Sequence, residues 1–349
     1  MKVTNIALAT VVSLGLVSTS LSADDKKVLL KVPTTFSTSL IGLGTPLPAF
    51  KKGLESISST VKVKIYEPKK LIAPFEILDA VSSGKVNAGW STAGYWKGKH
   101  PAAGSFSSVP FGPEAPEFFS WLYQGNGMKL YQKMYDDAKY NVHVLPCSIS
   151  SPETAGWFKK EINSPEDLKG LKMRFFGLGG DVMSKLGVAT SLLPGGEIFS
   201  ALEKGVIDAS EFSMPVVDKL LGFHKIAKFN YFPGWHQQAT VFELLINNNT
   251  WNKMSSMQQN AIAMTCKANM TDSLAESEAV QGAAIRENIE KNGVQVKRWS
   301  PEMLKEFRGA WGEALVDLRK DETFDAVWKD LSAFRKDYKF WNELAFLPR

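Results

Sequence analysis

The sequence contains little cysteine and little histidine, and both shortages limit the chemistry that it can carry. Its 349 residues include two cysteines and four histidines. Neither cysteine has a second cysteine or a histidine at zinc-motif spacing, and the histidines show no metal-ligand spacing, which argues against a structural zinc site. No nucleophile with an acid and a base emerges from the sequence, which weakens the case for an enzyme.

The two cysteines, Cys147 and Cys266, lie far apart in the sequence. An exported protein can join such a pair in a disulfide. Sequence alone does not show whether their β-carbons meet. Because unpaired cysteine is commonly buried as a small apolar residue, the pattern favours two buried free thiols over a disulfide.

Long apolar runs are also missing after the N-terminal segment, so no later stretch is predicted to span a bilayer. Residues 1–23 are predicted to be a signal peptide. Lys2 forms a short basic region, Ile6 to Val17 forms an apolar core too short for a membrane helix, and small residues offer cleavage near residue 22 or 23. A retained membrane anchor is the alternative. The junction has no lipobox-like cysteine, which argues against a lipid anchor.

Basic stripes and nucleotide-binding loops are absent as well. The formal net charge is +5, and the basic residues are dispersed, so no nucleic-acid partner is predicted. The run from Gly177 to Gly180 lacks the Lys-Ser/Thr that follows in a phosphate-binding loop. The run from Gly89 to Gly94 has its second glycine one residue too late for a nucleophile elbow. Turns that need glycine are the simpler interpretation.

The elements that the sequence does predict alternate between strands and helices. Strands are expected at Val28 to Phe36, Val61 to Tyr66 and Ala88 to Ser91, with helices between them. This order predicts an α/β fold with parallel strands, and the length predicts two domains. A helix is predicted from a cap at Thr250 to about Lys291; at about 1.5 Å per residue it would cover roughly 60 Å and bridge both domains.

One arginine and two acids stand out between Ser151 and Gln238. Arg174 lies in an apolar, strand-like run, and arginine binds a carboxylate with two hydrogen bonds and stays charged when desolvated. Glu153 and Glu211 lie at loop-like positions near aromatic residues, and carboxylates there can bind a cation. The set suits a small anion held together with a cation. A structural ion pair or a helix cap is the alternative for each residue.

Several longer motifs carry a resemblance to a known family. They are Val109-Pro110-Phe111-Gly112, Gly156-Trp157-Phe158-Lys159-Lys160-Glu161-Ile162, Leu168-Lys169-Gly170-Leu171-Lys172-Met173-Arg174, the run from Gly195 to Asp208, Pro233-Gly234-Trp235, and the Phe334-Arg335 pair with its aromatic tail. With these motifs the chain resembles the periplasmic solute-binding subunits of TRAP transporters, and within them the branch for 2-oxo acids and lactate. The resemblance covers essentially the whole mature chain.

The resemblance implies an α/β fold of two lobes hinged around a cleft, with a long helix spanning both. It implies that Arg174 forms a salt bridge with the substrate carboxylate. It also implies a cation in the cleft, Na⁺ or Ca²⁺, held by Glu153, Glu211, the carbonyl of Phe212 and Gln237. Glu153 and Phe212 are expected to contact the substrate as well.

Two of these positions depart from the branch. Glu153 stands where the branch commonly has glutamine, and Gln237 stands where it commonly has glutamate, so two carboxylates and one amide remain. We expect the cation site to survive with its ligand charges exchanged. A substrate carboxylate beside two unneutralised glutamates in a dry cleft would be strongly disfavoured.

The aromatic residues of the cleft are less well defined by the sequence. Phe36, Trp90, Tyr95 and Trp96 are candidate cleft walls, and plain core packing is an equal alternative. Phe212 replaces a tryptophan that is frequent in the branch, and Ile149 replaces a frequent asparagine. Both changes leave the identity of the acid open.

The predicted organisation and function follow. The segments are a signal peptide at 1–23, a first lobe at 24–149 plus 234–277, a second lobe at 150–233 plus 278–325, and a C-terminal helical tail at 326–349 that is a candidate for homodimerisation. The predicted function is periplasmic capture of a small monocarboxylate, such as pyruvate or lactate, for delivery to a TRAP membrane permease. The alternatives are a different organic acid such as a dicarboxylate or sulfonate, an exported enzyme, or a sensor-linked binding module.

Overall fold

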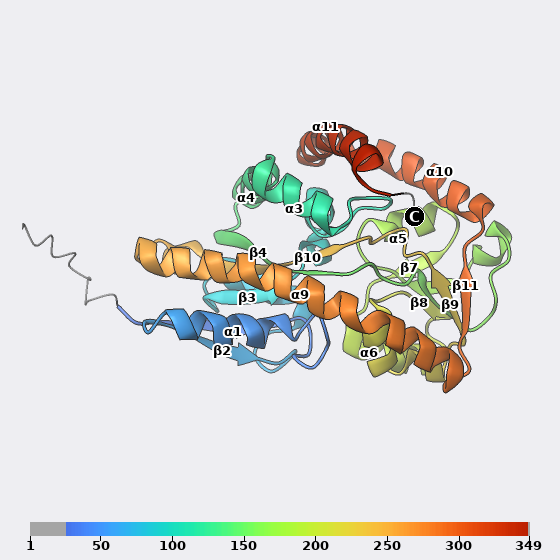
Figure 1. The fold of residues 1–349 in the computed structure, drawn as a ribbon, viewed down its shortest axis with the longest axis horizontal. Helices are drawn as coiled ribbons and strands as arrows, with labels where there is room; N and C mark the ends of the chain where they lie inside the picture. The colour runs from blue at the N-terminus through green and yellow to red at the C-terminus, as the bar shows by residue number, and fades with distance from the viewer. Residues whose placement is uncertain (1–25, 348–349) are drawn as a thin grey trace, which may run out of the picture.

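The computed structural model describes residues 26–347, so the predicted signal peptide lies outside the described residues. Two groups of strands lie side by side, and one long helix, α9 (Ser256–Glu290), runs along both of them (Figure 1). Among the described residues, the structure contains no helix with both the length and the apolar character that a membrane crossing requires. The predicted two-lobed α/β arrangement is therefore the observed one.

The strands of the first lobe form one mixed sheet. A bridge between Thr34 and Trp90 joins a parallel pair to an antiparallel trio, which gives the order β2-β1-β3-β10-β4. The three strands predicted to be parallel, β1, β2 and β3, are parallel to one another, whereas β10, which returns from the second lobe, runs antiparallel to both β3 and β4. The strands are β1 (Val28–Pro33), β2 (Val61–Tyr66), β3 (Ala88–Ser91), β4 (Val142–Ser150) and β10 (Thr240–Asn247).

Short helices cover this sheet. The sequence from Glu117 to Ala138 has a helical pattern throughout, but it forms parts of two helices that break at Gly125, where a Cβ atom would lie 2.7 Å from the carbonyl oxygen of Trp121. The predicted loop after Gly94 consists largely of 3₁₀ turns. The elements are α1 (Pro46–Ile57), η1 (Pro74–Glu76), α2 (Ile77–Ser82), η2 (Ala93–Trp96), η3 (Pro101–Phe106), α3 (Ala115–Gln124), α4 (Gly127–Asp137) and α8 (Asn248–Trp251).

The second lobe contains a six-stranded sheet in the order β11-β9-β5-β8-β6-β7. Its strands are short, since β8 has two residues and several others have three or four. They are β5 (Gly156–Phe158), β6 (Lys172–Arg174), β7 (Ala189–Ser191), β8 (Ala209–Ser210), β9 (Phe229–Phe232) and β11 (Gln295–Arg298). The accompanying helices are η4 (Pro165–Leu168), α5 (Gly179–Lys185), α6 (Gly195–Glu203), α7 (Pro215–Leu220) and η5 (Phe223–Lys225).

Two segments without helix or strand, 151–155 and 233–239, carry the chain between the sheets, and we call them the crossing segments. They lie against each other, because the backbone N–H of Glu153 donates to the carbonyl of Gln237 at 3.1 Å. Gly234 allows this approach, since a Cβ atom there would lie 2.2 Å from the carbonyl oxygen of Glu153. Helix α9 makes a third connection. The predicted lobe boundaries near these positions stay a prediction.

Helix α9 begins later than predicted. Ser255 caps it, with its side chain accepting from the backbone of Gln258, whereas Thr250 lies inside the separate helix α8. Small polar residues of α9 then hydrogen-bond the backbone at the end of β4. Four residues of a helix rise about 6 Å, and two residues of a strand rise about 6.6 Å. Every fourth residue of α9 can therefore contact every second residue of the strand. The pairs are Asn269 with Cys147, Ser273 with Ile149, and Ser277 with Ser151.

The same packing corrects the prediction for the cysteines. Cys147 of β4 and Cys266 of α9 form a disulfide, with their Cα atoms 4.2 Å apart across a sequence separation of 119 residues. Two buried free thiols were expected, because the sequence does not show that α9 lies on β4. The disulfide fixes the long helix to the sheet of the first lobe.

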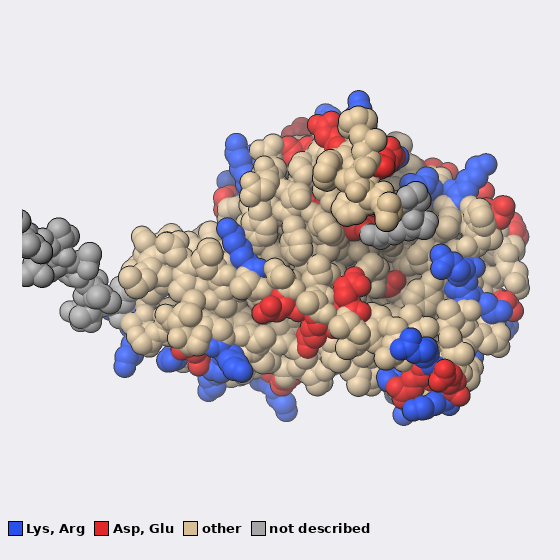
Figure 2. Space-filling view, viewed as in Figure 1, with Lys and Arg blue, Asp and Glu red and all other residues tan. Residues whose placement is uncertain are grey.

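The last two helices return across the molecule. Helix α10 (Pro301–Leu318) begins at the predicted serine-proline start, with Ser300 as its cap, and packs against α5 of the second lobe. Helix α11 (Glu322–Ala345) reaches back over η3, α3 and α4 of the first lobe (Figure 1). Lysines and arginines are scattered over the face in Figure 2 rather than gathered in a stripe.

Candidate functional site

A small cavity lies between the lobes, and residues of both lobes and of the crossing segments line it. Its volume is about 20 Å³. Its polar lining residues are Thr92, Tyr95, Glu153, Arg174, Gln237 and Thr240, and its apolar lining residues are Phe36, Leu43, Phe176, Phe212 and Phe242.

Arg174, at the end of β6, contributes the positive charge of the cavity. The residue is 1% exposed. Its Nη1 donates to the carbonyl of Glu211 at 2.8 Å and to Oε1 of the same residue at 2.7 Å, and its Nε donates to the carbonyl of Leu193 at 3.2 Å. The guanidinium lies 5.2 Å from the ring centre of Phe212. Arg174 therefore lines the cavity and also takes part in a buried ion pair.

Glu211 follows the short strand β8 and uses one carboxylate oxygen for protein contacts. Oε1 accepts from Arg174 and from the backbone N–H of Phe176. Oε2 has no hydrogen-bond partner in the described part of the chain and lies 3.5 Å from Nε2 of His236. Burial favours the neutral acid, but the charge of Arg174 and the nearby His236 outweigh it and hold the pKa of Glu211 below its usual value.

Glu153, in the first crossing segment, is less well compensated. Its Oε1 accepts from the hydroxyl of Thr240 at 3.3 Å, and its Oε2 has no partner among the described residues. Burial raises the pKa of Glu153 well above its usual value, and the negative charges of Glu211 and Asp218 add to this effect. A positive charge placed beside Glu153 would reverse that preference.

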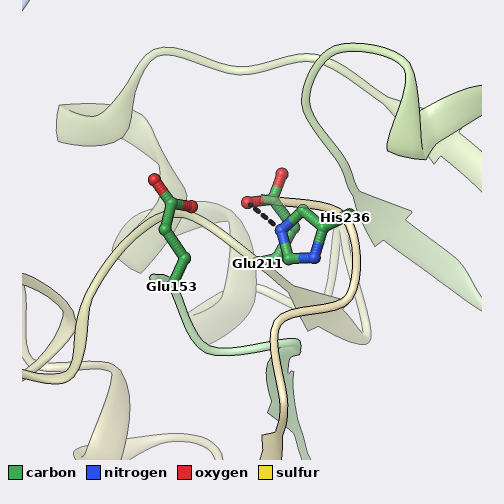
Figure 3. Close-up of side chains that lie close together, drawn as sticks. All are labelled: Glu153, Glu211 and His236. Atoms are coloured by element: carbon green, nitrogen blue, oxygen red, sulfur yellow. Dashed lines mark ion pairs between the residues drawn. The ribbon is translucent and has the colours of Figure 1, made fainter. Parts of the chain in front are cut away.

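Gln237, in the second crossing segment, uses only the nitrogen of its side-chain amide for a hydrogen bond within the protein. Its Nε2 donates to Oγ1 of Thr240 at 2.7 Å, which leaves Oε1 without a partner among the described residues. The preceding residue, His236, is 1% exposed and points toward the two acids (Figure 3). Glu153, Glu211 and His236 each offer a ligand atom within 4.8 Å of the others.

His236 was not among the predicted site residues, because no other histidine lies at metal-ligand spacing from it in the sequence. The available signal was its position next to Gln237, one of the expected cation ligands. Because His236 is adjacent to Gln237 in the chain, it lies near the same site although it has no metal-ligand spacing.

The donor set of this cluster fits a cation. Three buried oxygens of this cluster have no hydrogen-bond partner among the described residues, namely Oε2 of Glu153, Oε2 of Glu211 and Oε1 of Gln237. Buried polar atoms in native structures are nearly always hydrogen-bonded, so three such oxygens close together need a further partner. Carboxylate and amide oxygens are the ligands that Ca²⁺ and similar hard cations prefer.

The aromatic candidates divide into two groups. Phe36, Tyr95 and Phe212 line the cavity, and burial raises the pKa of the Tyr95 hydroxyl, so that it remains a neutral donor. Trp90 and Trp96 are not among the lining residues. Their indole N–H groups donate to the carbonyl of Leu43 and to the carboxylate of Glu243, respectively.

Two of the remaining sequence features lie in the framework around the cavity. Ile149, where relatives often carry asparagine, is a buried residue of β4 whose backbone N–H donates to Ser273 of α9. Asp218, which sequence reasoning did not single out, is buried beneath the crossing segments and accepts from the indole of Trp157 at 2.7 Å. Burial raises its pKa to about 7.

Comparison with known proteins shows the family to which the chain belongs. Residues 41–321 match the family model DctP, bacterial extracellular solute-binding protein, family 7. A monocarboxylate 2-oxoacid-binding periplasmic protein of Nostoc sp. is 38% identical over 296 residues, which are 84% of this chain and 80% of the relative.

Two solved structures extend the comparison to three dimensions. A TRAP periplasmic solute-binding protein of Colwellia psychrerythraea, with bound calcium and pyruvate, is 32% identical at a TM-score of 0.87, covering 92% of this chain and 98% of that one. Another from Pseudoalteromonas atlantica, with bound sodium and pyruvate, is 30% identical at a TM-score of 0.87, covering 92% and 97%. This chain therefore belongs to family 7 of the bacterial extracellular solute-binding proteins, the DctP family of periplasmic solute-binding subunits of TRAP transporters.

Proposed function

We propose that this protein captures a small 2-oxo or 2-hydroxy monocarboxylate, such as pyruvate or lactate, together with a bound Na⁺ or Ca²⁺, and delivers it unchanged to a TRAP membrane permease. The observation that carries the proposal is the group of three unpartnered, buried oxygens beside Arg174. It combines the two features that such a solute needs: a cationic donor for its carboxylate and ligands for a cation that also binds its 2-oxygen.

Arg174 is the residue that we assign to the solute carboxylate. Its Nε and Nη1 make the hydrogen bonds to protein acceptors described above, so Nη2 is the donor available to a ligand. The neutral hydroxyl of Tyr95 is a second donor at the same end of the cavity. A charge-assisted pair in a closed, water-poor cavity is strong because little solvent competes with it.

Glu153, Glu211, the carbonyl of Phe212 and Gln237 are the residues that we assign to the cation. The cation would neutralise the two glutamates and bridge the carboxylate and 2-oxygen of the solute. This assignment explains how Glu153 can face an anionic ligand although burial and its neighbours favour its neutral form. We expect the two lobes, divided as the sequence predicts, to close over the ligand before it is delivered to the permease.

Thermal melting of the mature protein against a panel of organic acids tests the proposal. A ligand that binds only the folded state raises the melting midpoint by mass action. We expect a rise with a 2-oxo or 2-hydroxy monocarboxylate and none with a dicarboxylate or a sulfonate. Recovery of the acid unchanged, checked by NMR, separates binding from turnover by an exported enzyme.

Removal of the cation sharpens the same experiment. A rise that disappears after treatment with a chelator and returns with Ca²⁺ assigns calcium. A rise that survives the chelator but depends on sodium in the buffer assigns Na⁺. Absence of a rise with every carboxylate tested would contradict the proposed solute class.

Helix α11 carries the second part of the proposal, a homodimer. Large apolar side chains near its end and just beyond are strongly exposed: Phe340, Trp341, Leu344, Phe346 and Leu347. A contiguous apolar surface of this kind is typical of a protein interface. Light scattering of the full chain is expected to give the mass of a dimer, and Trp341→Lys with Leu344→Lys is expected to give a monomer that still binds the solute.

A further inference from the structure

A second, larger pocket lies directly outside the small cavity and shares two of its walls. The outer pocket encloses about 370 Å³ and opens between the lobes. Phe36 and Phe212 are the two residues that line both the outer pocket and the inner cavity. Phe36 follows β1 of the first lobe and Phe212 follows β8 of the second. The two rings therefore stand between the two spaces, one from each side of the cleft.

The ring of Phe212 is held in place from several directions. It lies 5.2 Å from the guanidinium carbon of Arg174 and packs edge-on against Phe223, with ring centres 6.4 Å apart. Gly195, at the start of α6, leaves room for the ring, because a Cβ atom there would lie 2.3 Å from its Cζ. Gly195 itself lines the outer pocket. The ring thus separates Arg174 from the pocket beyond it.

Phe36 is fixed on the opposite side by aromatic contacts. Its ring packs edge-on against Phe242 at 5.3 Å and against Tyr95 at 6.0 Å, and its backbone N–H donates to the hydroxyl of Thr34. Both Phe36 and Phe212 are at most 5% exposed. Neither ring is a loosely attached surface group.

The outer pocket suits an apolar chain. Much of its wall is aliphatic or proline, namely Leu40, Pro68, Pro74, Pro194 and Leu221. The charged residues Lys69 and Glu197 pair with each other across the lobes at 2.6 Å, so their charges are mutually compensated. Glu67, the third charged residue of the lining, accepts hydrogen bonds from the backbone N–H and the hydroxyl of Thr38, and it keeps these partners when an added hydrocarbon segment displaces water from the pocket.

We propose that Phe36 and Phe212 form a partition that sets the chain-length limit of the solute, and that the outer pocket receives the chain of a longer 2-oxo acid when this partition is reduced. This inference rests on the proposed function. The proposed function assigns the carboxylate to Arg174 and the 2-oxygen to the cation, which leaves the hydrocarbon end of the solute to contact the phenylalanine rings of the lining. In the wild-type protein the partition stops that end, which selects acids of about three carbons.

Phe176 provides a matched control. Like Phe212, it is a phenylalanine that lines the inner cavity near the guanidinium of Arg174, at 6.0 Å, and a glycine makes room for its ring, here Gly94 at 2.2 Å. Phe176 does not line the outer pocket. Phe176→Ala and Phe212→Ala therefore remove the same atoms from the same cavity, but only the second opens it outward.

The test is calorimetric titration of wild type and both variants with pyruvate, 2-oxobutanoate, 2-oxopentanoate and 2-oxohexanoate. The quantity compared is the ratio of affinities for the long and the short acid. Because one methylene in an apolar pocket changes affinity by about tenfold or more, Phe212→Ala is expected to shift this ratio toward the longer acids by at least about tenfold. Phe176→Ala is expected to leave the ratio near that of wild type. Phe36→Ala should act as Phe212→Ala does.

The outcomes separate this inference from the proposed function. If wild type binds none of the acids, the proposed function fails. If wild type binds pyruvate but Phe212→Ala and Phe176→Ala shift the ratio equally, or neither shifts it, the partition is wrong and the proposed function stands. Should an alanine variant not fold, as judged by its melting curve, the Phe212→Leu and Phe176→Leu pair gives the same comparison with a smaller expected shift.

Discussion

Two clusters in the molecule contain buried glutamate, and they differ in how many of the carboxylate oxygens accept hydrogen bonds. Glu243, in β10, receives hydrogen bonds on both carboxylate oxygens. Trp96 donates to Oε1 at 2.8 Å, Tyr131 donates to Oε2 at 2.5 Å, and Tyr135 lies within 3.0 Å of both. None of its three partners carries a charge, and nothing further is required for this group to be buried.

The second cluster, Glu153 with Glu211, is built from the same residue type but is left incomplete. Each of these acids keeps one oxygen without a partner among the described residues, and so does Gln237 beside them. Arg174 supplies a single positive charge. The comparison shows that a buried acid is not by itself evidence of a binding site. The evidence is a group of buried oxygens that the protein leaves without partners at a cavity.

The largest change in solute affinity and in stability is expected from Arg174→Met, which alters only the cluster of Glu153 and Glu211. Solute affinity should fall at least about 30-fold, because truncating one partner of a buried, hydrogen-bonded charge pair costs about 2–5 kcal/mol. The free energy of unfolding should also fall by about 3–5 kcal/mol, because Glu211 is left as an uncompensated buried charge. Calorimetry and urea unfolding measure the two effects.

A double variant separates those effects. Arg174→Met with Glu211→Gln removes the stranded charge, so it should recover stability without recovering solute binding. Solute binding at wild-type affinity in either variant would show that Arg174 acts only in the structural ion pair.

Next in size is the pH dependence expected from the satisfied cluster. Burial raises the pKa of Glu243 from 4.5 to about 7, and its three donors offset this only in part. The folded state therefore holds the proton more tightly than the unfolded state does. The resulting stability is fully present below about pH 4.5 and is lost as pH rises to about 7, a change of about 3 kcal/mol.

Urea unfolding of wild type and Glu243→Gln at pH 4.5 and pH 8 tests this expectation. The variant should lose less stability than wild type over that interval, and at each pH the two proteins should bind the solute with equal affinity. Identical losses in the two proteins would mean that Glu243 does not titrate between these values.

Exchanging the charges of the cation ligands should have a smaller effect. Glu153→Gln removes one of two carboxylates and is expected to lower cation affinity by about tenfold or more, because ligand charge tunes affinity for such cations. Stability without added cation should not fall, since Glu153 already favours its neutral form. Cation titration of stripped protein by calorimetry measures the first effect and thermal melting the second.

The reciprocal variant, Gln237→Glu, serves as the control for that exchange. It adds a third carboxylate to the cluster, so it should raise cation affinity, and together with Glu153→Gln it should restore an affinity near that of wild type. Unchanged cation affinity in all three variants would remove these residues from the site.

The smallest effect is expected from Tyr131→Phe. The variant deletes one donor to Glu243, while Tyr135 still reaches the same oxygen. Unfolding free energy should fall by about 1 kcal/mol, the usual net value of a hydrogen bond. Solute and cation affinity should not change. A clear loss of solute binding here would mean that the two clusters are coupled, and the comparison would fail.

The sequence by itself determined much of the local structure. Ser300-Pro301 is typical of a helix start and begins α10. The run from Thr250 to about Lys291 predicted a helix long enough to serve both lobes, although α9 begins only after Ser255. Arg174 lies in the apolar, strand-like run that forms β6. Such features depend on caps, propensities and periodicity within a few residues, and these are readable from one segment at a time. The longer motifs added the family and hence the two-lobed fold.

Only the tertiary structure decided which distant segments meet. The disulfide between Cys147 and Cys266 exists because α9 lies on β4, and β10 is antiparallel because it returns from the other lobe. His236 joins the two acids because the crossing segments lie against each other. The outer pocket behind Phe212 exists because the lobes face each other. Packing between segments many tens of residues apart fixes these contacts, and no short stretch of sequence contains that information.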